Sequence, residues 1–277
     1  MITRTSKGSA SNKVSGTTLS VASVAIVENA SIVVCLGHDP VAVTSVKWNS
    51  LDLTKIVEET NGSNVQGSIW ALDDCTAATG NVDVVFGSAI DAKAMTVSQL
   101  IGETNSSAGG QVATDVFSSA QGSGTSLSSG STGTLSFKGE LAIGALVWEA
   151  TLANGGTGDF VFTGQIENLS GGAGDSNIAL AEYSLVEDED DAFTLTRTGA
   201  SPSADWVALV VGFYEFVSQV QVAQEYRTFN YTKDRVEVAQ QYRSFNYTND
   251  RVEVQQQYRT FWYIASPTED EPFALII

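Results

Sequence analysis

The chain has 277 residues, and 43% of them are hydrophobic, which is enough for a packed core and excludes a largely disordered protein. Its formal net charge of −18 repels phosphate groups, so we expect neither nucleic acid nor an anionic membrane as a partner. Val, Thr, Ser, Gly and Ala are abundant whereas Lys, Arg and Glu are sparse, a composition that favours pleated strands over helices. The sequence therefore predicts an all-β protein.

The first fifteen residues are polar, and we expect residues 1–15 to form a mobile or docking arm. They lack the apolar centre of a secretory signal. No apolar run in the chain approaches the roughly 20 residues that a membrane-spanning helix needs. We therefore expect the protein to be assembled in the cytoplasm or exported by another route, and we expect no membrane partner.

Residues 16–217 are expected to form one large β-sandwich domain. Segments rich in Val, Ile, Thr and aromatic residues recur along it, separated by turn residues such as those at 37–40, 61–64 and 79–81. Short strands at regular spacing, with Gly and Asn between them, are typical of a sandwich or barrel. The last expected strand is apolar throughout, which predicts a central strand buried on both faces. The expected strands are Thr17–Val27, Ala30–Leu36, Thr44–Trp48, Leu53–Val57, Gln66–Ala71, Asn81–Phe86, Met95–Ile101, Leu135–Phe137, Leu141–Trp148, Asp159–Thr163, Asn177–Tyr183, Ala192–Thr198 and Trp206–Phe216.

Several strand motifs of this domain follow one another in a characteristic order. They are VKWNSLDL at 46–53, GSIW at 67–70, TGNVDVVF at 79–86, LAIGALV at 141–147 and SADWVALVVG at 203–212. This order resembles the jelly-roll-like sandwiches of bacterial surface proteins and phage proteins. The resemblance covers most of the chain and implies a jelly-roll-like β-sandwich, but it points to no individual site residue.

The most specific feature is a tandem repeat near the C-terminal end. Three segments, VQVAQEYRTFNY, VEVAQQYRSFNY and VEVQQQYRTFWY, begin at Val220, Val236 and Val252 and so recur every 16 residues. A finer period of 8 lies inside this repeat, because arginine occurs at every eighth position from Arg227 to Arg259. Octads of this kind resemble the tandem repeats found near the C-termini of phage virion proteins.

An eight-residue step distinguishes a strand from a helix. It advances an α-helix by about 800°, so successive arginines would lie about 80° apart and spiral around the helix. On a strand an even step returns each copy to the same face. We therefore expect each octad to form a short strand and a turn, with turn sequences at 232–234 and 248–250 and Ala-Gln-Gln in the matching place of the alternate octads. Stacked octads would form ladders of arginine, of phenylalanine and of valine.

Residues 218–265 are expected to form an oligomerisation shaft. A segment of this length buries too little surface to be stable alone, and its strand edges would lack partners. Three chains wound together as a β-prism would satisfy both needs, so a homotrimer is the expected assembly. A dimer, a larger ring, and a single-chain meander folded onto the sandwich are the alternatives. The residues expected to mediate oligomerisation are Arg227, Arg235, Arg243, Arg251, Arg259, Phe229, Phe245, Phe261, Tyr226, Tyr242 and Tyr258.

The shaft arginines have two interpretations. They either pair with acidic residues of the shaft, and so hold the register between chains, or face an acidic partner surface or a glycan. The acidic candidates are Asp234, Glu237, Asp250 and Glu253. Residues 219–265 contain six basic and five acidic residues, a near balance that favours internal pairing.

Residues 266–277 form a C-terminal tail, in which an acidic spacer precedes the apolar end FALII. We expect this end either to add a strand to the sheet of a partner or to plug the end of the shaft, and a frayed terminus is the alternative. The residues expected to dock a partner are Phe273, Leu275, Ile276 and Ile277.

The sequence offers little for catalysis or metal binding. His38 is the only histidine, and its surroundings, Gly-His-Asp-Pro, predict a surface turn rather than a catalytic base. A zinc site needs more His and Cys ligands than the chain offers, and Cys35 and Cys75 are interpreted as free thiols, with Cys35 in an apolar strand. The acidic run Glu187–Asp191 lacks the spacing of a calcium loop, so a solvated loop is the preferred interpretation. We expect no catalytic residue, metal or cofactor.

The tryptophans and carboxylates allow further alternatives. Trp48, Trp70, Trp148 and Trp206 lie inside apolar strands and are expected in the core, although one of them would also suit a glycan-stacking surface. With 32 acidic residues some pair always lies close in space, so a carboxylate pair for glycoside hydrolysis is only a weak signal.

These features predict a non-enzymatic virion structural protein, a capsid decoration or fibre component with a sandwich head and an oligomerising shaft. Its expected partners are further copies of itself and other virion proteins, such as the major capsid protein or tail proteins. Symmetry and avidity would supply affinity that no single site provides. The alternatives are a carbohydrate-binding adhesin or receptor-binding module that holds a host glycan, and a glycan-degrading enzyme.

Overall fold

The computed structural model describes residues 2–102, 111–137, 139–149, 161–168, 178–187, 192–198, 204–216, 220–232, 235–248, 251–264 and 274–276. Across these ranges the chain is all-β and contains no helix, as its composition predicts. Accordingly, no helix in them is long and apolar enough to span a membrane. The chain divides into two compact units, residues 1–216 and 217–277.

The first unit contains antiparallel sheets, each named here by one of its strands. The central sheet has the strand order β1-β9-β3-β7-β6, the β2 sheet has the order β2-β8-β4-β5, and the β12 sheet has the order β10-β16-β12-β14-β13. Strands β11 and β15 pair only with each other. The strand bounds are β1 (Ile2–Asn12), β2 (Gly16–Ile26), β3 (Ala30–His38), β4 (Val43–Trp48), β5 (Leu51–Asp52), β6 (Thr54–Asn61), β7 (Val65–Cys75), β8 (Ala78–Ile90), β9 (Lys93–Gly102), β10 (Gln111–Gly124), β11 (Ser126–Ser128), β12 (Glu140–Trp148), β13 (Val161–Asn168), β14 (Ile178–Glu187), β15 (Thr196–Thr198) and β16 (Ala204–Phe216).

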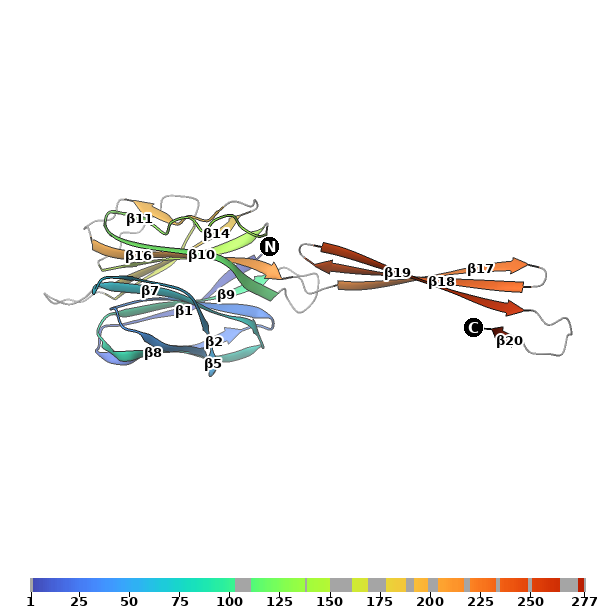
Figure 1. Cartoon of the computed structure of the whole chain (residues 1–277). Helices are drawn as coiled ribbons and strands as arrows, with labels where there is room; N and C mark the ends of the chain where they lie inside the picture. Colours follow the sequence, from blue (N-terminus) through green and yellow to red (C-terminus); the bar gives the residue numbers. More distant parts are fainter. Residues whose placement is uncertain are drawn as a thin grey trace. The chain divides into compact units, whose positions relative to one another are not determined.

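The three large sheets stack in layers, with the central sheet between the other two (Figure 1). Every position of β3 is buried. Its Val33 and Cys35 belong to the core shared with the β12 sheet, whereas Ile32, Val34 and Leu36 belong to the core shared with the β2 sheet. A strand that is covered on both faces has a continuous apolar sequence, and such runs in the sequence therefore predicted stacked sheets. The number of layers is three, one more than in a simple two-sheet jelly roll.

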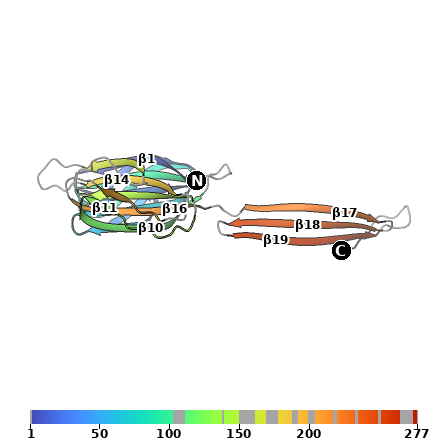
Figure 2. The ribbon, with the colours of Figure 1, turned by 90° about the horizontal axis from the view of Figure 1, so that it is seen from above.

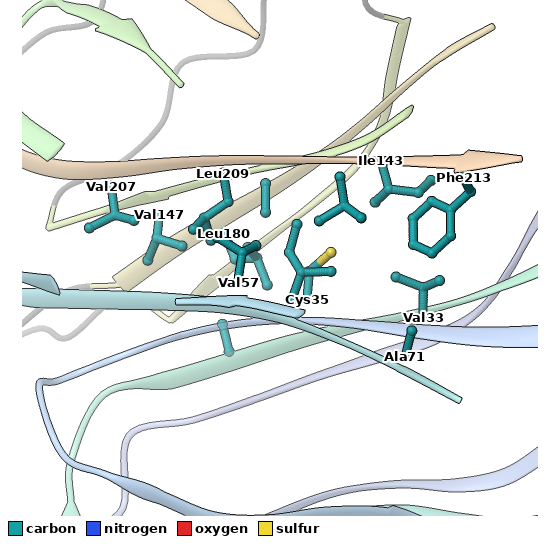
Figure 3. Packing of buried hydrophobic residues seen from close by; sticks show 14 of the residues in the cluster. Val33, Cys35, Val57, Ala71, Ile143, Val147, Leu180, Val207, Leu209 and Phe213 are labelled. Carbon is teal, nitrogen blue, oxygen red and sulfur yellow. The ribbon is translucent and has the colours of Figure 1, made fainter. Parts of the chain in front are cut away.

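The central sheet approaches the β12 sheet closely at two paired glycines. Gly37 of β3 lies directly opposite Gly67 of β7. A Cβ atom added to Gly67 would lie 2.8 Å from a methyl group of Val147 and 2.9 Å from one of Leu209. A Cβ atom added to Gly37 would lie 2.6 Å from Val147. The side chains of Val147, Val207 and Leu209 point towards the central sheet in Figure 3, so the two glycines leave the space that these side chains fill.

The outer face of the β12 sheet has a core of its own. Leu135, Phe193 and Leu195 are buried there together with Trp148 and Trp206. The prediction of a strand at Leu135–Phe137 is wrong, and only the last three residues of the predicted strand Ala192–Thr198 are extended, as β15. Loop residues that cover a sheet are apolar for the same reason as strand residues, which explains the error. The prediction that the final strand is central is confirmed, because β16 lies between β10 and β12 with core residues on both faces.

The N-terminal segment, predicted as a mobile or docking arm, is instead part of the sandwich, because residues 2–12 form strand β1 of the central sheet. It pairs with β9 from Ile2 opposite Gly102 to Asn12 opposite Lys93. The sequence also gives no signal for β10. Both are edge strands, and edge strands carry polar residues at many positions, so the apolar alternation that identifies a strand is weak in them.

The second unit contains one sheet in the part of it that the structure describes. Strands β17 (Val220–Thr232), β18 (Arg235–Thr248), β19 (Arg251–Ile264) and β20 (Ala274–Ile276) pair in chain order (Figure 2). The prediction of one short strand per octad is wrong, since each long strand runs through parts of two successive octads and Ala239-Gln240-Gln241 lies inside β18. The strands do change at the predicted turn sequences, 232–234 and 248–250. We refer to β17 to β20 as the repeat sheet.

Candidate interaction surface

The repeat fixes the register of the repeat sheet twice over. Between β17 and β18, Val220 lies opposite Tyr247, and Thr232 lies opposite Arg235. Between β18 and β19 the same pairing recurs sixteen residues later, with Val236 opposite Tyr263 and Thr248 opposite Arg251. Val, Tyr, Phe and Thr dominate these strands, and such residues suit a pleated surface. The two hairpins β17–β18 and β18–β19 therefore have the same register, with equivalent repeat positions opposite each other in both.

The arginines do not form the predicted ladder. Arg227 of β17 and Arg259 of β19 both lie opposite Gln240 of β18, whereas Arg243 of β18 lies opposite Gln224 and Gln256. Residues directly opposite each other share a face, and successive residues of a strand alternate between faces. Arg243 is an odd number of residues from Gln240, so its position is on the other face. The eight-residue step keeps a common face within one strand but not across a hairpin with this register.

The remaining arginines lie at strand ends. Arg235 is opposite Thr232 and Ile264, and Arg251 is opposite Thr248. Glu237, one of the predicted ion-pair partners, is opposite Asn230 and Trp262 instead. Asp234 and Asp250 lie outside the described residues. Among the described residues of the repeat sheet, the register thus places no acidic residue directly opposite an arginine, and pairing of the arginines within the shaft stays a prediction.

The phenylalanines alternate with valines across the sheet instead of stacking on one another. Phe229 and Phe261 flank Val238 in one row, and Phe245 lies between Val222 and Val254 in another. These two rows fall on opposite faces and at opposite ends of the strands. A second apolar row lies beside each of them on the same face, Tyr231–Val236–Tyr263 beside the first and Val220–Tyr247–Val252 beside the second. Each face of the sheet therefore has an apolar end and a polar end.

The tyrosines predicted to mediate oligomerisation occupy the middle of the strands. Tyr226 and Tyr258 both lie opposite Gln241, and Tyr242 lies opposite Glu225 and Gln257. The sequence does not predict Glu225 as a site residue. The feature that marks it in the sequence is a departure from the repeat, since the matching positions of the other two strands are Gln241 and Gln257.

Part of the C-terminal tail pairs with its own chain. In β20, Leu275 lies opposite Tyr263 and Ile276 lies opposite Trp262 of β19. The predicted docking residues Phe273 and Ile277 are outside the described residues. The described part of the tail thus adds a strand to the sheet of its own chain, whereas the addition expected from the sequence was to the sheet of a partner.

The prediction for His38 is wrong, because it is a core residue and not part of a surface turn. Strand β3 continues to His38, which is 0% exposed and packs edge-on against Phe86 with 5.0 Å between ring centroids. Its Nδ1 donates a hydrogen bond to the backbone oxygen of Asp39 at 2.7 Å. Burial lowers the pKa of His38, so the neutral ring is favoured. A buried ring without access to solvent is unsuited to act as a general base.

The carboxyl groups of Asp115 and Glu140 lie together at the end of the β12 sheet. The backbone N–H of Phe137 donates to Glu140 Oε1 at 3.0 Å, and that of Ser136 donates to Asp115 Oδ2 at 2.9 Å. Burial and the hydrogen bond with Asp115 raise the pKa of Glu140 to about 8. These hydrogen bonds tie residues 135–137 to the sheet, and Glu140 itself is 0% exposed, so its carboxyl group is not available to a glycan.

A buried ion pair joins the central sheet to the β12 sheet. Arg4 Nε on β1 donates to Glu182 Oε1 on β14 at 2.7 Å, and Ser98 Oγ on β9 donates to the same atom at 2.6 Å. These partners are 178 and 84 residues from Glu182 in sequence, so no local pattern identifies them.

The cysteines and tryptophans behave as predicted. Cys35 and Cys75 are buried free thiols, and the four strand tryptophans, Trp48, Trp70, Trp148 and Trp206, are buried. Among the residues with assigned positions, no group of three or more His, Cys, Asp or Glu side chains is placed to hold a metal ion. Residues 188–191 of the acidic run lie outside that set.

Comparison with known proteins gives no relative. No family model, no curated protein and no solved structure matches the chain. Function is therefore inferred from the residues of this chain alone, and the repeat sheet is the candidate site.

Proposed function

We propose that the chain is a non-enzymatic virion structural protein, a capsid decoration or fibre component, which forms a symmetric homo-oligomer through its repeat sheet. The observation that carries this proposal is the pattern of the repeat sheet. Both faces contain two adjacent apolar rows, and the described part of the second unit supplies no second layer to cover either of them. A single layer of strands gains stability in water when an apolar face packs against another element.

The first unit supports a structural role. Its three stacked sheets bury His38, the only histidine of the chain, and Glu140, the carboxyl group whose pKa is raised to about 8. The net charge of −18 suits a protein that stays soluble at high copy number. Repeated copies on a virion surface would dock through avidity, so each contact can be weak.

The pairing of the repeat strands within one chain bears on the expected number of chains in the oligomer. A prism of interwoven chains would place strands of different copies next to one another, whereas β17, β18 and β19 pair within one chain. Self-association then involves faces or edges of a sheet that is already formed. Symmetric contacts of this kind are commonest in two-fold dimers.

Sedimentation of the full chain tests the proposal. We expect the full chain to sediment as an oligomer, and a chain that ends at Phe216 to sediment as a folded monomer that keeps the near-ultraviolet circular dichroism bands of its four buried tryptophans. A monomeric full chain, or a truncated chain with the same oligomer mass, would refute the role of the repeat sheet. Cryo-electron microscopy of the native particle would then show which virion surface carries the protein.

A further inference from the structure

Strand β17 is an end strand of the repeat sheet. On one side it pairs with β18, and on the other side no strand of the described chain pairs with it. The opposite edge of the sheet is partly covered, because β20 pairs with β19 at Trp262–Ile264, whereas the rest of β19 has no partner on that side among the described strands. An end strand presents a row of backbone N–H and C=O groups, and these groups can pair with a strand of another chain.

The charges of β17 differ from those of the other two repeats. In β18 and β19 the acidic residue is the second of the repeat, at Glu237 and Glu253. In β17 that position is Gln221, and the acidic residue is Glu225, two residues before Arg227. The repeat therefore changes its charge pattern only in β17, the end strand that has no outer partner anywhere along its length in the described chain.

The new position of the charge has a geometric consequence. Strand β17 spans Val220–Thr232, so Tyr226 is its central residue. When two copies of β17 pair antiparallel over their full length, Tyr226 lies opposite itself and Val220 lies opposite Thr232. Glu225 of each copy then lies directly opposite Arg227 of the other. Opposite charges at directly opposed positions stabilise an antiparallel pair, and this pairing contains two of them.

We propose that two copies of the chain join edge to edge through β17, antiparallel about a two-fold axis at Tyr226. The inference rests on the proposed self-association and adds an edge contact to it, in which Glu225 and Arg227 of the two copies fix the register. This contact extends the sheet and leaves the apolar rows on its faces open to further packing. A two-fold axis uses the same patch of each copy. It places each residue opposite the one that lies equally far on the other side of Tyr226, so each face of one sheet continues into the same face of the other.

A single cysteine tests the axis directly. A residue on a two-fold axis faces its own copy, and directly opposed Cα atoms of antiparallel strands are about 4.5–5.5 Å apart, within the range of a disulfide. We expect Tyr226→Cys to form a disulfide-linked dimer under mild oxidation of the full chain. The matched control is Tyr242→Cys, the same repeat position in β18, which should not crosslink. Native Cys35 and Cys75 are buried and contribute little background.

Exchange of the two charges tests the register. Glu225→Arg or Arg227→Glu alone places like charges opposite each other twice, and we expect each to raise the dissociation constant about tenfold or more. The double variant E225R/R227E restores opposite charges and should restore association. The control Gln241→Glu adds a charge at the matching position of β18 and should change association little.

The outcomes separate this contact from self-association itself. A native chain that sediments as a monomer overturns both. A native oligomer in which Tyr226→Cys crosslinks no better than Tyr242→Cys, or in which the double charge exchange fails to restore association, overturns the β17 contact and leaves self-association intact. Crosslinking specific to Tyr226→Cys, together with rescue by the double exchange, supports the contact.

Discussion

Replacement of Gly67 by alanine tests how closely the central sheet packs on the β12 sheet. The added Cβ would lie 2.8 Å from Val147, 2.9 Å from Leu209 and 3.2 Å from Val207. Carbon atoms in proteins pack at about 3.5–4.0 Å, so all three side chains would have to move. We expect the variant to destabilise the first unit.

The magnitude follows from two opposing effects. An extra methyl group in a filled core costs about 1–3 kcal/mol, and the loss of glycine's freedom in the unfolded chain returns about 0.4–1 kcal/mol. The expected net loss for Gly67→Ala is therefore about 1–2 kcal/mol. Val147→Ala alone should lose about 1–3 kcal/mol because it leaves a cavity. In the double variant the new methyl group occupies part of that cavity, so the total loss should fall short of the sum by about 1 kcal/mol.

Urea unfolding followed by fluorescence of the buried tryptophans measures these differences. The control is Gly16→Ala in β2, where the nearest atom to an added Cβ is the backbone oxygen of Val14 at 3.8 Å. It should change stability by no more than about 0.5 kcal/mol, or raise it slightly. Equal stability of Gly67→Ala and Gly16→Ala, or additive losses in the double variant, would show that the two layers are not in close contact at Val147.

Three further predictions concern buried polar groups and thiols. Arg4→Ala removes the guanidinium from Glu182, which is 1% exposed, and should lower the free energy of unfolding in urea by about 3 kcal/mol. Lys47→Ala, which breaks the exposed pair with Asp52, should lower it by less than about 0.5 kcal/mol. Similar losses in the two variants would contradict the buried pair. Because burial raises the pKa of Glu140 to about 8, the folded state holds this proton more tightly than the unfolded chain does, and the resulting stability is lost as the pH rises from the ordinary carboxyl pKa towards about 8. The glutamine in Glu140→Gln stays neutral at every pH. The urea midpoint of this variant should therefore rise relative to that of the native chain as the pH increases from 5 to 8, and parallel pH profiles would refute this. Burial raises the pKa of the Cys35 thiol and raises that of Cys75 to about 11, so neither should react with an aromatic disulfide reagent at pH 8 before unfolding; rapid labelling of the native protein would disprove it.

The sequence by itself determined the features that depend on local pattern. Composition predicted strands throughout, and the apolar runs located most of those in the first unit, for example Leu141–Trp148, observed as β12 (Glu140–Trp148). The repeat predicted extended backbone at its correct place, because an even step suits a strand and not a helix. The same repeat located the two connections at 232–234 and 248–250.

Only the tertiary structure decided which strands face one another. The third layer, the edge strands β1 and β10, and the burial of His38 all depend on contacts between distant segments, such as Arg4 with Glu182, 178 residues away. In the repeat, the sequence predicted one face for all arginines, but the register of the hairpins places Arg227 and Arg243 on opposite faces. Periodicity along a chain fixes the side of a single strand to which a residue belongs, whereas the pairing between strands decides how those sides combine into the faces of a sheet.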